Sequence, residues 1–356
     1  MSALQQIHLV RADEPDRDAP SRETRQTQPN EGREGTVLLS RVADAVYWTG
    51  RYLERAEHTA RLIDVDFQLR LDQSPKSSST RWLRLLEALQ VPVPAGGKID
   101  SATLAYTLTL DRTNPSSIVS CISSARENLR QVREQCSSEM WEQLNRLYLQ
   151  IVATPAGESW ILHSQLFFRG ALDGAHLFQG VTDSTMSHGE GWQYIQLGRF
   201  VERTHGLATL IATHFRKFTQ PWEYTIDTDE YLEWVGLLKD CAAFEAYCKK
   251  YTAELRPLRV AEFLLLNPDF PHSVRFSVDK VHAALRSVSE LTERKADSPS
   301  RLAGRMRANL SFAQIEEIMA DGLQTHLSNV QRLCGQAHNA IQQIYFDYPV
   351  ESALAR

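Results

Sequence analysis

Apolar residues recur every three or four positions along most of the chain after residue 36, which is the spacing of one face of an α-helix. The prolines of the last third, such as Pro257 and Pro299, fall between these periodic segments and not inside them. No stretch shows the strict polar–apolar alternation of a strand, and no Asn-Gly or Asp-Gly turn joins two such stretches. The pattern therefore predicts an all-α protein built as a large helical bundle.

The same periodicity and punctuation predict where the helices lie. Serines and prolines mark several helix starts, since they suit the first turn or the position before it. The predicted helices cover residues 40–71, 82–89, 102–110, 118–135, 138–151, 158–181, 192–217, 231–238, 241–255, 260–266, 273–291, 301–319 and 323–346.

One sequence pattern occurs in two of the longest predicted helices. Gly-Arg-x-x-Glu-Arg begins at Gly50 and again at Gly198, and apolar positions after each copy keep the same spacing. Every matched residue of the second copy follows the first by 148 positions, without a gap. This predicts two equivalent long helices and an internal duplication of a helical unit.

Arginines and glutamates of the two copies are expected to pair if the two helices pack side by side. The planar guanidinium of arginine satisfies both oxygens of a carboxylate, so such pairs fix the register of the helices. Gly50 and Gly198 would let the two backbones approach closely. The predicted pairs are Glu54 with Arg203 and Glu202 with Arg55, with Arg51 and Arg199 flanking them.

A sharper interpretation gives the same residues a binding role. The four arginines Arg51, Arg55, Arg199 and Arg203 would leave excess positive charge in a cleft, which would bind a carboxylate or a phosphate. Tyr47 and Trp48 would form an aromatic wall of this cleft. The structural and the binding interpretations are compatible, and both remain open at this point.

Two other patterns have simpler explanations. Glu202 and His205 have the E-x-x-H spacing of di-metal helical bundles, but the first copy has Glu57 at the matching position of His205. An arginine beside each candidate glutamate also disfavours a cation, so we predict no metal and no cofactor. Arg126 belongs to a basic stripe that more often marks a solvated helix face than a site.

Composition excludes several classes of protein. The net charge of −5 and the pI near 6.1 argue against a general nucleic-acid binder. No apolar run is long enough to span a membrane, and residues 1–10 lack the pattern of a secretory signal. The five cysteines form no C-x-x-C pair, which favours reduced thiols in the cytoplasm. No phosphate loop, dinucleotide fingerprint, H-E-x-x-H or G-x-S-x-G motif is present.

The first 35 residues differ in character from the rest of the chain. Residues 11–35 hold many charges and three prolines, with almost no large apolar side chain. Such a segment buries too little apolar surface to offset the entropy of ordering. We therefore predict a disordered tail over residues 1–35 and a helical domain over residues 36–350.

The chain resembles the alpha-E family, a bacterial all-helical domain named for its helices and its E-R motif. The resemblance covers about residues 37–348, so residues 36–350 are expected to form one alpha-E domain, with repeat-like units at about 37–180 and 185–350. The segments that carry the resemblance are Ser40-Arg41-Val42-Ala43, Tyr47-Trp48-x-Gly50-Arg51-Tyr52-Leu53-Glu54-Arg55, Ala125-Arg126-Glu127-Asn128, Ser138-Glu139-Met140-Trp141, Gly191-Trp192, Gly198-Arg199-x-x-Glu202-Arg203 and Glu262 to Phe276.

The resemblance implies a role beside an ATP-dependent ligase. Genes of this family tend to accompany a circularly permuted ATP-grasp protein and a transglutaminase-like protein, and the proposal for such clusters is peptide or amide-bond synthesis. The chain would then be a helical binding or accessory component of an amidoligase system. The alternative is an enzyme that uses Glu54 or Glu202 as acid or base. Neighbouring arginines would lower the pKa of these glutamates, which favours the non-catalytic role.

Overall fold

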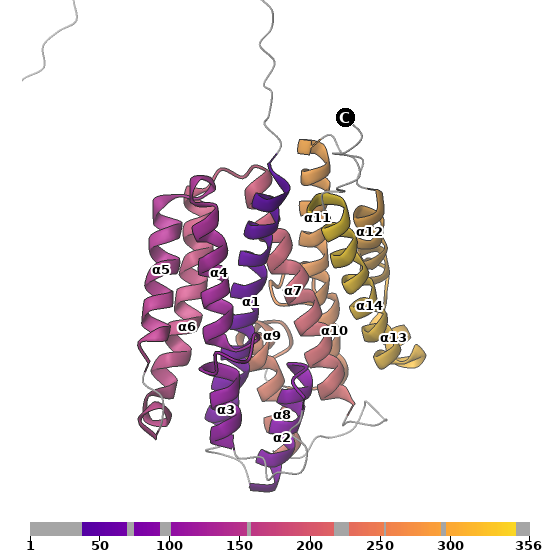
Figure 1. Ribbon diagram of the computed structural model, residues 1–356. Helices are drawn as coiled ribbons and strands as arrows, with labels where there is room; N and C mark the ends of the chain where they lie inside the picture. Colours follow the sequence, from indigo (N-terminus) through magenta and orange to yellow (C-terminus); the bar gives the residue numbers. More distant parts are fainter. Residues whose placement is uncertain are drawn as a thin grey trace, which may run out of the picture. The chain divides into compact units, whose positions relative to one another are not determined.

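The computed structural model describes residues 38–69, 75–92, 101–154, 158–216, 228–252, 254–292 and 297–346. All of the described residues belong to one compact unit, Val37–Arg356. The disordered tail predicted for residues 1–35 lies outside the described residues. Within the ranges given, every regular element is helical, which confirms the predicted all-α class (Figure 1).

Fourteen α-helices follow one another along these ranges, with a 3-10 turn at Arg133–Gln135 and a π-helical turn at Gln342–Phe346. They are α1 (Ser40–Leu69), α2 (Pro75–Ala88), α3 (Ser101–Thr109), α4 (Ile118–Gln131), α5 (Ser138–Val152), α6 (Glu158–Thr185), α7 (Glu190–Phe215), α8 (Thr228–Asp240), α9 (Phe244–Tyr251), α10 (Pro257–Leu266), α11 (Val274–Thr292), α12 (Asp297–Ser311), α13 (Ile315–Asp321) and α14 (Leu323–Ile341).

Most predicted helices are present, but several differ in extent from the prediction. The helix expected over 82–89 is α2, which already begins at Pro75, and the helix expected over 118–135 ends as an α-helix at Gln131. Two further helices differ more strongly. The helix expected over 241–255 is the short α9, because Ala242 and Thr252 adopt positive φ angles of 50° and 63° on either side of it. The helix expected over 301–319 breaks into α12 and α13 at an extended Gln314. No proline or glycine marks this break. Instead α13 turns to pack against α10 and α14, which buries Ile315 and Ile318.

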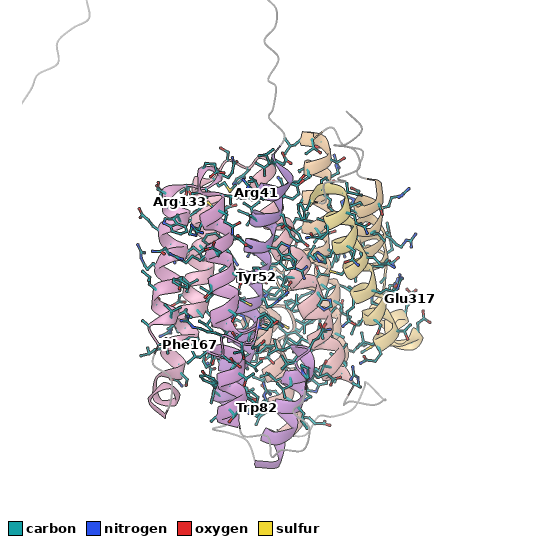
Figure 2. The ribbon with its side chains drawn as sticks, in the orientation of Figure 1. Arg41, Tyr52, Trp82, Arg133, Phe167 and Glu317 are labelled. Carbon is teal, nitrogen blue, oxygen red and sulfur yellow. The ribbon has the colours of Figure 1, made fainter. Side chains whose placement is uncertain are left out.

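The helices pack into two rings of four that meet at α1 and α7 (Figure 1). In the first ring α1 contacts α4, α4 contacts α5, α5 contacts α6, and α6 returns to α1. In the second ring α7, α11, α12 and α14 contact one another in the same cyclic order. Buried apolar side chains fill the space between the helices (Figure 2). None of the described helices is long and apolar enough to cross a membrane.

Glycine brings α1 and α7 together at the junction of the two rings. A Cβ atom added at Gly50 would collide with the carbonyl oxygen of Ile195, and one added at Gly198 would collide with the carbonyl oxygen of Tyr47. Ile195 follows Tyr47 by the same 148 positions that separate the two glycines. The contact is therefore reciprocal, and the predicted close approach of the two backbones is confirmed. We call this contact of parallel helices the α1–α7 seam.

Candidate functional site

Glu54 is held on the α1–α7 seam by two arginines of α7. Arg203 donates to both of its carboxylate oxygens, with Nη2 at 2.8 Å from Oε2 and Nε bonded to Oε1. Nε of Arg199 lies 3.6 Å from Oε2. Both Glu54 and Arg203 are buried, with side chains 3% and 2% exposed. The predicted pairing of Glu54 with Arg203 is confirmed.

Glu202 has the corresponding arrangement with two arginines of α1. Nε of Arg55 donates to Oε1 at 2.7 Å, and Nε of Arg51 donates to Oε2 at 2.7 Å. The side chains of Arg55 and Arg51 are 27% and 11% exposed, so this half is more open to solvent. The predicted pairing of Glu202 with Arg55, flanked by Arg51, is also confirmed. These six residues, Arg51, Glu54, Arg55, Arg199, Glu202 and Arg203, form what we call the E-R cluster.

The two flanking arginines differ in their hydrogen bonds. Arg51 bonds to Glu202, lies 3.1 Å from Nδ1 of His338, and stacks over the Trp48 ring at 4.9 Å. Nε of Arg199 is buried without a hydrogen-bond partner, since 3.6 Å to Glu54 is too long. Burial lowers the pKa of Arg199, and the charge of Arg203 lowers it further. Nε of Arg51 therefore has a hydrogen-bond acceptor, whereas Nε of Arg199, at the equivalent position of the second copy, has none.

The carboxylates of the cluster have different protonation tendencies. Burial alone would raise the pKa of Glu202, but the charges of Arg51 and Arg55 outweigh burial and lower it to about 2. Burial raises the pKa of Glu54 against the opposing charge of Arg203, and the Glu57 carboxylate adds to the rise. The expected lowering of the pKa by arginine therefore holds for Glu202 and is wrong for Glu54, because Glu54 is deeper and has an acidic neighbour.

Glu57 extends the cluster into a region that sequence reasoning missed. Its carboxylate accepts from Arg61 at 2.8 Å and from Gln179 at 3.2 Å, and its Oε1 lies 3.0 Å from Nε2 of His176. Nε2 of His272 is 4.0 Å away. Hydrogen bonding and the surrounding cations hold the pKa of Glu57 well below its usual range, although burial opposes them. Nothing in the local pattern around 176 or 272 indicates this contact, since both residues come from other helices or loops.

A loop difference between the two halves places His272 there. Asn114 begins a turn that ends at Ser117, the N-cap of α4, whereas Asn267 begins a turn that ends at Ser273, before α11. The second turn is three residues longer. The carbonyl oxygen of Pro271, inside the longer turn, accepts from Nη1 of Arg203 at 3.2 Å. The extra residues therefore cover the Glu54 half of the cluster and leave the Glu202 half open.

The four arginines do not line one cleft, which corrects the prediction. Arg51 and Arg55 line a cleft of about 300 Å³ with Glu54, His58, Gln90, Glu202 and His205. We call it the Arg55 cleft. Arg199 lines a separate cleft of about 570 Å³ between α6, α7 and α11, together with Lys280. We call this one the Lys280 cleft. Arg203 reaches both, because it lies between them on α7.

Three other predicted site residues lie outside these clefts. Tyr47 is fully buried, with its hydroxyl 2.8 Å from Nδ1 of His338, and Trp48 packs against Tyr52. Neither ring lines the Arg55 cleft or the Lys280 cleft, so the expected aromatic wall is not part of either cleft. Arg126 donates to Asn145 at 2.8 Å and stacks over rings of α5, so its contacts join α4 to α5.

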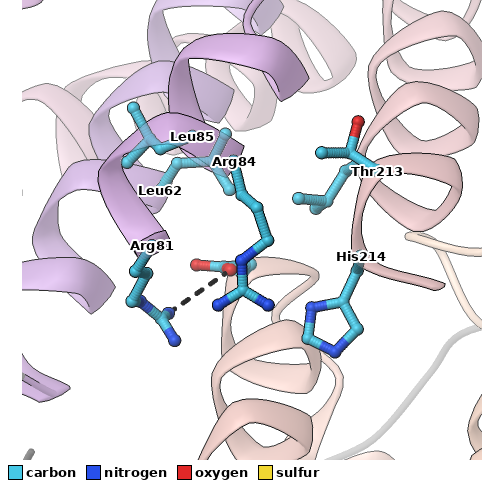
Figure 3. A pocket seen from close by; sticks show the side chains of 8 residues that line it. Leu62, Arg81, Arg84, Leu85, Thr213 and His214 are labelled. Carbon is cyan, nitrogen blue, oxygen red and sulfur yellow. Dashed lines mark ion pairs between the residues drawn. The ribbon is translucent and has the colours of Figure 1, made fainter. Parts of the chain in front are cut away.

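A second buried group of charges lies at α2 and α8. Arg81 pairs with Asp66 at 3.1 Å, with Glu233 at 3.6 Å and with Asp240 at 3.7 Å. Figure 3 shows Arg81 and Arg84 directed into one small cavity beside His214 of α7. Burial raises the pKa of Asp240 to about 7, partly countered by Arg81. These residues lie on four separate helices, so no spacing within one helix predicts that they meet.

Over the ranges that the structure describes, no three His, Cys, Asp or Glu side chains are grouped as metal ligands would be. His205 lies 3.2 Å from the side-chain oxygen of Gln90 in the Arg55 cleft. Burial lowers the pKa of His58 to about 4, and the charge of Arg61 lowers it further.

The depressed pKa of His58 predicts a loss of stability in mild acid. Between pH 6.5 and about 4 the unfolded chain binds a proton at this position and the folded chain does not. The free energy of unfolding should therefore fall as the pH falls through this window, by roughly 2–3 kcal/mol for this residue. Chemical denaturation at pH 7 and pH 4.5 measures the change. His58→Gln should reduce the loss, whereas His188→Gln, at an exposed ring, should leave it unchanged.

Comparison with known proteins now assigns the family. Residues 38–346 match the model of the Alpha-E family, described as a predicted alpha-helical domain with a conserved ER motif. An uncharacterized protein of Mycobacterium bovis (Mb2597) is 24% identical over 321 residues, which cover 83% of this chain and 35% of the relative. An uncharacterized protein of Mycobacterium tuberculosis (Rv2567) is 23% identical over the same extent.

The chain thus spans about a third of the length of the curated relatives it matches. No solved structure gave a significant match. The family description names an ER motif, and the Glu-Arg pairs at 54–55 and 202–203 both belong to the E-R cluster. The family match covers most of the chain and all of the described helices, and this chain therefore belongs to the Alpha-E family.

Proposed function

We propose that the chain is a helical binding component of an ATP-grasp amidoligase system, and that its Arg55 cleft holds an anionic group of the substrate. The group would be a carboxylate or a phosphate of a peptide or its activated form. The observation that carries the proposal is the sharing of one carboxylate, Glu202, by two arginines in an open cleft. Two guanidinium groups against one carboxylate leave one positive charge in excess.

The surroundings of Glu202 support binding more than catalysis. Its pKa of about 2 keeps it ionised at neutral pH, where it is a poor proton donor. Around the whole cluster the charges are five arginines (Arg51, Arg55, Arg61, Arg199 and Arg203) and three glutamates (Glu54, Glu57 and Glu202). Of the arginines that line the Arg55 cleft, Arg55 is the most exposed, so an incoming anion would meet it first.

One observation favours an enzyme as the second candidate. Glu54 also lines the Arg55 cleft, and burial raises its pKa, which suits a proton donor. In that case the chain alone would turn over a peptide or carboxylate substrate, and Glu54→Gln would abolish the turnover. Both oxygens of Glu54 are occupied by Arg203, which is why we rank binding first.

The proposed partners follow from the family resemblance. They are a circularly permuted ATP-grasp protein, which would supply the nucleotide site, and a transglutaminase-like protein. We propose a cytoplasmic location, where ATP is available; all five cysteines of the chain are free thiols, which suits this compartment. No nucleic acid or membrane enters the proposal.

Arg55→Gln tests the proposed function. In a reaction with the ATP-grasp neighbour, the variant is expected to lower ATP-dependent amide formation by about tenfold or more, since a charged contact to the substrate is lost. Its melting temperature should stay within about 3 °C of wild type, because Arg55 is partly exposed. The measurement is ADP release together with the amide product.

Arg130→Gln is the matched control. Arg130 is an exposed arginine of α4 that also pairs with a glutamate, Glu127, and it lies outside both clefts. It should retain wild-type ligation. Wild-type ligation with Arg55→Gln would contradict the binding role of the Arg55 cleft, and co-purification of the two proteins tests the partnership separately.

A further inference from the structure

The lining of the Lys280 cleft holds three cationic side chains, Arg199, Arg203 and Lys280, of which the two arginines pair with Glu54 behind the cleft. Arg199 lines it without a hydrogen-bonded acceptor for its buried Nε. Lys280 is exposed on α11, and no ion pair to it occurs among the described residues. The only acid in the described lining is Asp183, which lies 3.6 Å from His188 and is itself 64% exposed. The cleft therefore attracts negative charge.

Aromatic rings separate the two cations. The guanidinium of Arg199 lies 5.1 Å from the Phe200 ring, and Nζ of Lys280 lies 5.1 Å from the Phe276 ring. The two ring centroids are 6.0 Å apart. Each cation therefore lies beside one ring of a contacting pair of aromatic side chains. A ligand that meets both needs two anionic groups separated by a few bonds.

Amide side chains line the same cleft. Gln179, Gln193 and Gln196 belong to α6 and α7, and each carries both a donor and an acceptor. Trp192 adds an indole N–H that is buried without a hydrogen-bond partner. Side-chain amides of this kind pair with both the N–H and the C=O of a peptide group, whereas phosphate would accept from their N–H groups and leave their oxygens without a donor.

We propose that the Lys280 cleft is a second binding site, for a short acidic peptide whose carboxylates contact Arg199 and Lys280. Its peptide groups form hydrogen bonds with the glutamines, and the methylene groups of its side chains pack on Phe200 and Phe276. The site is separate from the Arg55 cleft and does not depend on the ATP-grasp partner. Arg203 lines both clefts, so the two sites share one buried wall.

The test is calorimetric titration of the full chain with tetraglutamate at low salt, where charge contacts are least screened. Lys280→Gln is expected to weaken binding about fivefold, and Arg199→Gln about tenfold or more. Lys250→Gln is the matched control, because Lys250 is also an exposed lysine over an aromatic ring, at 5.0 Å from Tyr251 on α9. It should leave the dissociation constant unchanged.

Two further arms separate this site from its alternatives. In the Arg55→Gln background a tetraglutamate site should survive and should still respond to Lys280→Gln; disappearance of all binding in Arg55→Gln would overturn the second site while keeping the first. Amidated tetraglutamine and inorganic phosphate should both bind at least tenfold more weakly than tetraglutamate. Equal binding of phosphate, or equal effects of Lys280→Gln and Lys250→Gln, would overturn the peptide assignment. Melting temperatures confirm that each variant is folded.

Discussion

Replacing Arg203 by methionine is expected to lower the free energy of unfolding by about 3–5 kcal/mol, because it leaves buried carboxylates without their cation. Methionine keeps much of the side-chain volume, so the loss reports on charge more than on packing. Glu54 loses a bidentate partner, and Glu57 loses a cation that lies 3.8 Å away. Neither carboxylate is more than 3% exposed, so water does not replace the arginine.

Arg55→Met is the matched variant, since Arg55 occupies the equivalent position in the first copy of the motif. Its side chain is 27% exposed, and Glu202 keeps Arg51 as a second partner. The expected loss is about 1 kcal/mol. Adding Glu54→Gln to Arg203→Met removes one unpaired charge and should recover part of the loss. Urea unfolding of the four proteins measures these differences, and equal losses for Arg203→Met and Arg55→Met would contradict the assigned burial.

Gly198→Ala is expected to lower the free energy of unfolding by about 3 kcal/mol or more, because the new methyl group meets backbone and not a movable side chain. The atom in its way is the carbonyl oxygen of Tyr47, within α1. The helices would have to separate, and the pairs of the E-R cluster would lengthen together. Gly50→Ala should have a similar effect, since it meets the carbonyl oxygen of Ile195.

Gly180→Ala is the control for the glycine substitution. Gly180 is an exposed glycine inside α6, and a Cβ atom there has no neighbour within 4 Å. Alanine should raise the free energy of unfolding by roughly 0.5–1 kcal/mol, because it restricts the unfolded chain and favours the helix. If Gly198→Ala were as harmless as Gly180→Ala in urea unfolding, the close packing of the α1–α7 seam would be wrong.

The contacts of the motif residues could be predicted residue by residue from the repeated sequence pattern. Two copies at a constant spacing imply equivalent helices, and equivalent helices that pack together must exchange their contacts. This reasoning predicted the pairs of Glu54 with Arg203 and Glu202 with Arg55, and the close approach at both glycines. The structure confirms each of these contacts. The two rings of four helices have matching packing order, while a common origin of the halves stays a prediction.

The differences between the halves were not predictable in the same way. The longer turn places the carbonyl oxygen of Pro271 against Arg203 on one side of the seam, and the four arginines line two clefts instead of the one expected. The acids that pair with Arg81 lie on other helices, so the periodicity of residues within one helix cannot predict these pairs. The break before α13 follows from packing against α10, which outweighs the helical preference of residues 301–319.

The α1–α7 seam also bears on how the chain is made. A ribosome adds roughly 5–20 residues per second, so α1 is synthesised on the order of ten seconds before α7 is complete, and α6, the last helix of the first ring, about 2–6 seconds before it. During that interval the face of α1 that carries Arg51, Glu54 and Arg55 stays in water. An apolar face in this position would invite aggregation of the nascent chain, whereas a charged one remains hydrated. We expect this charged face of α1 to keep the partly synthesised chain from aggregating. Once α7 has been synthesised, Gly50 and Gly198 let it pack closely against α1.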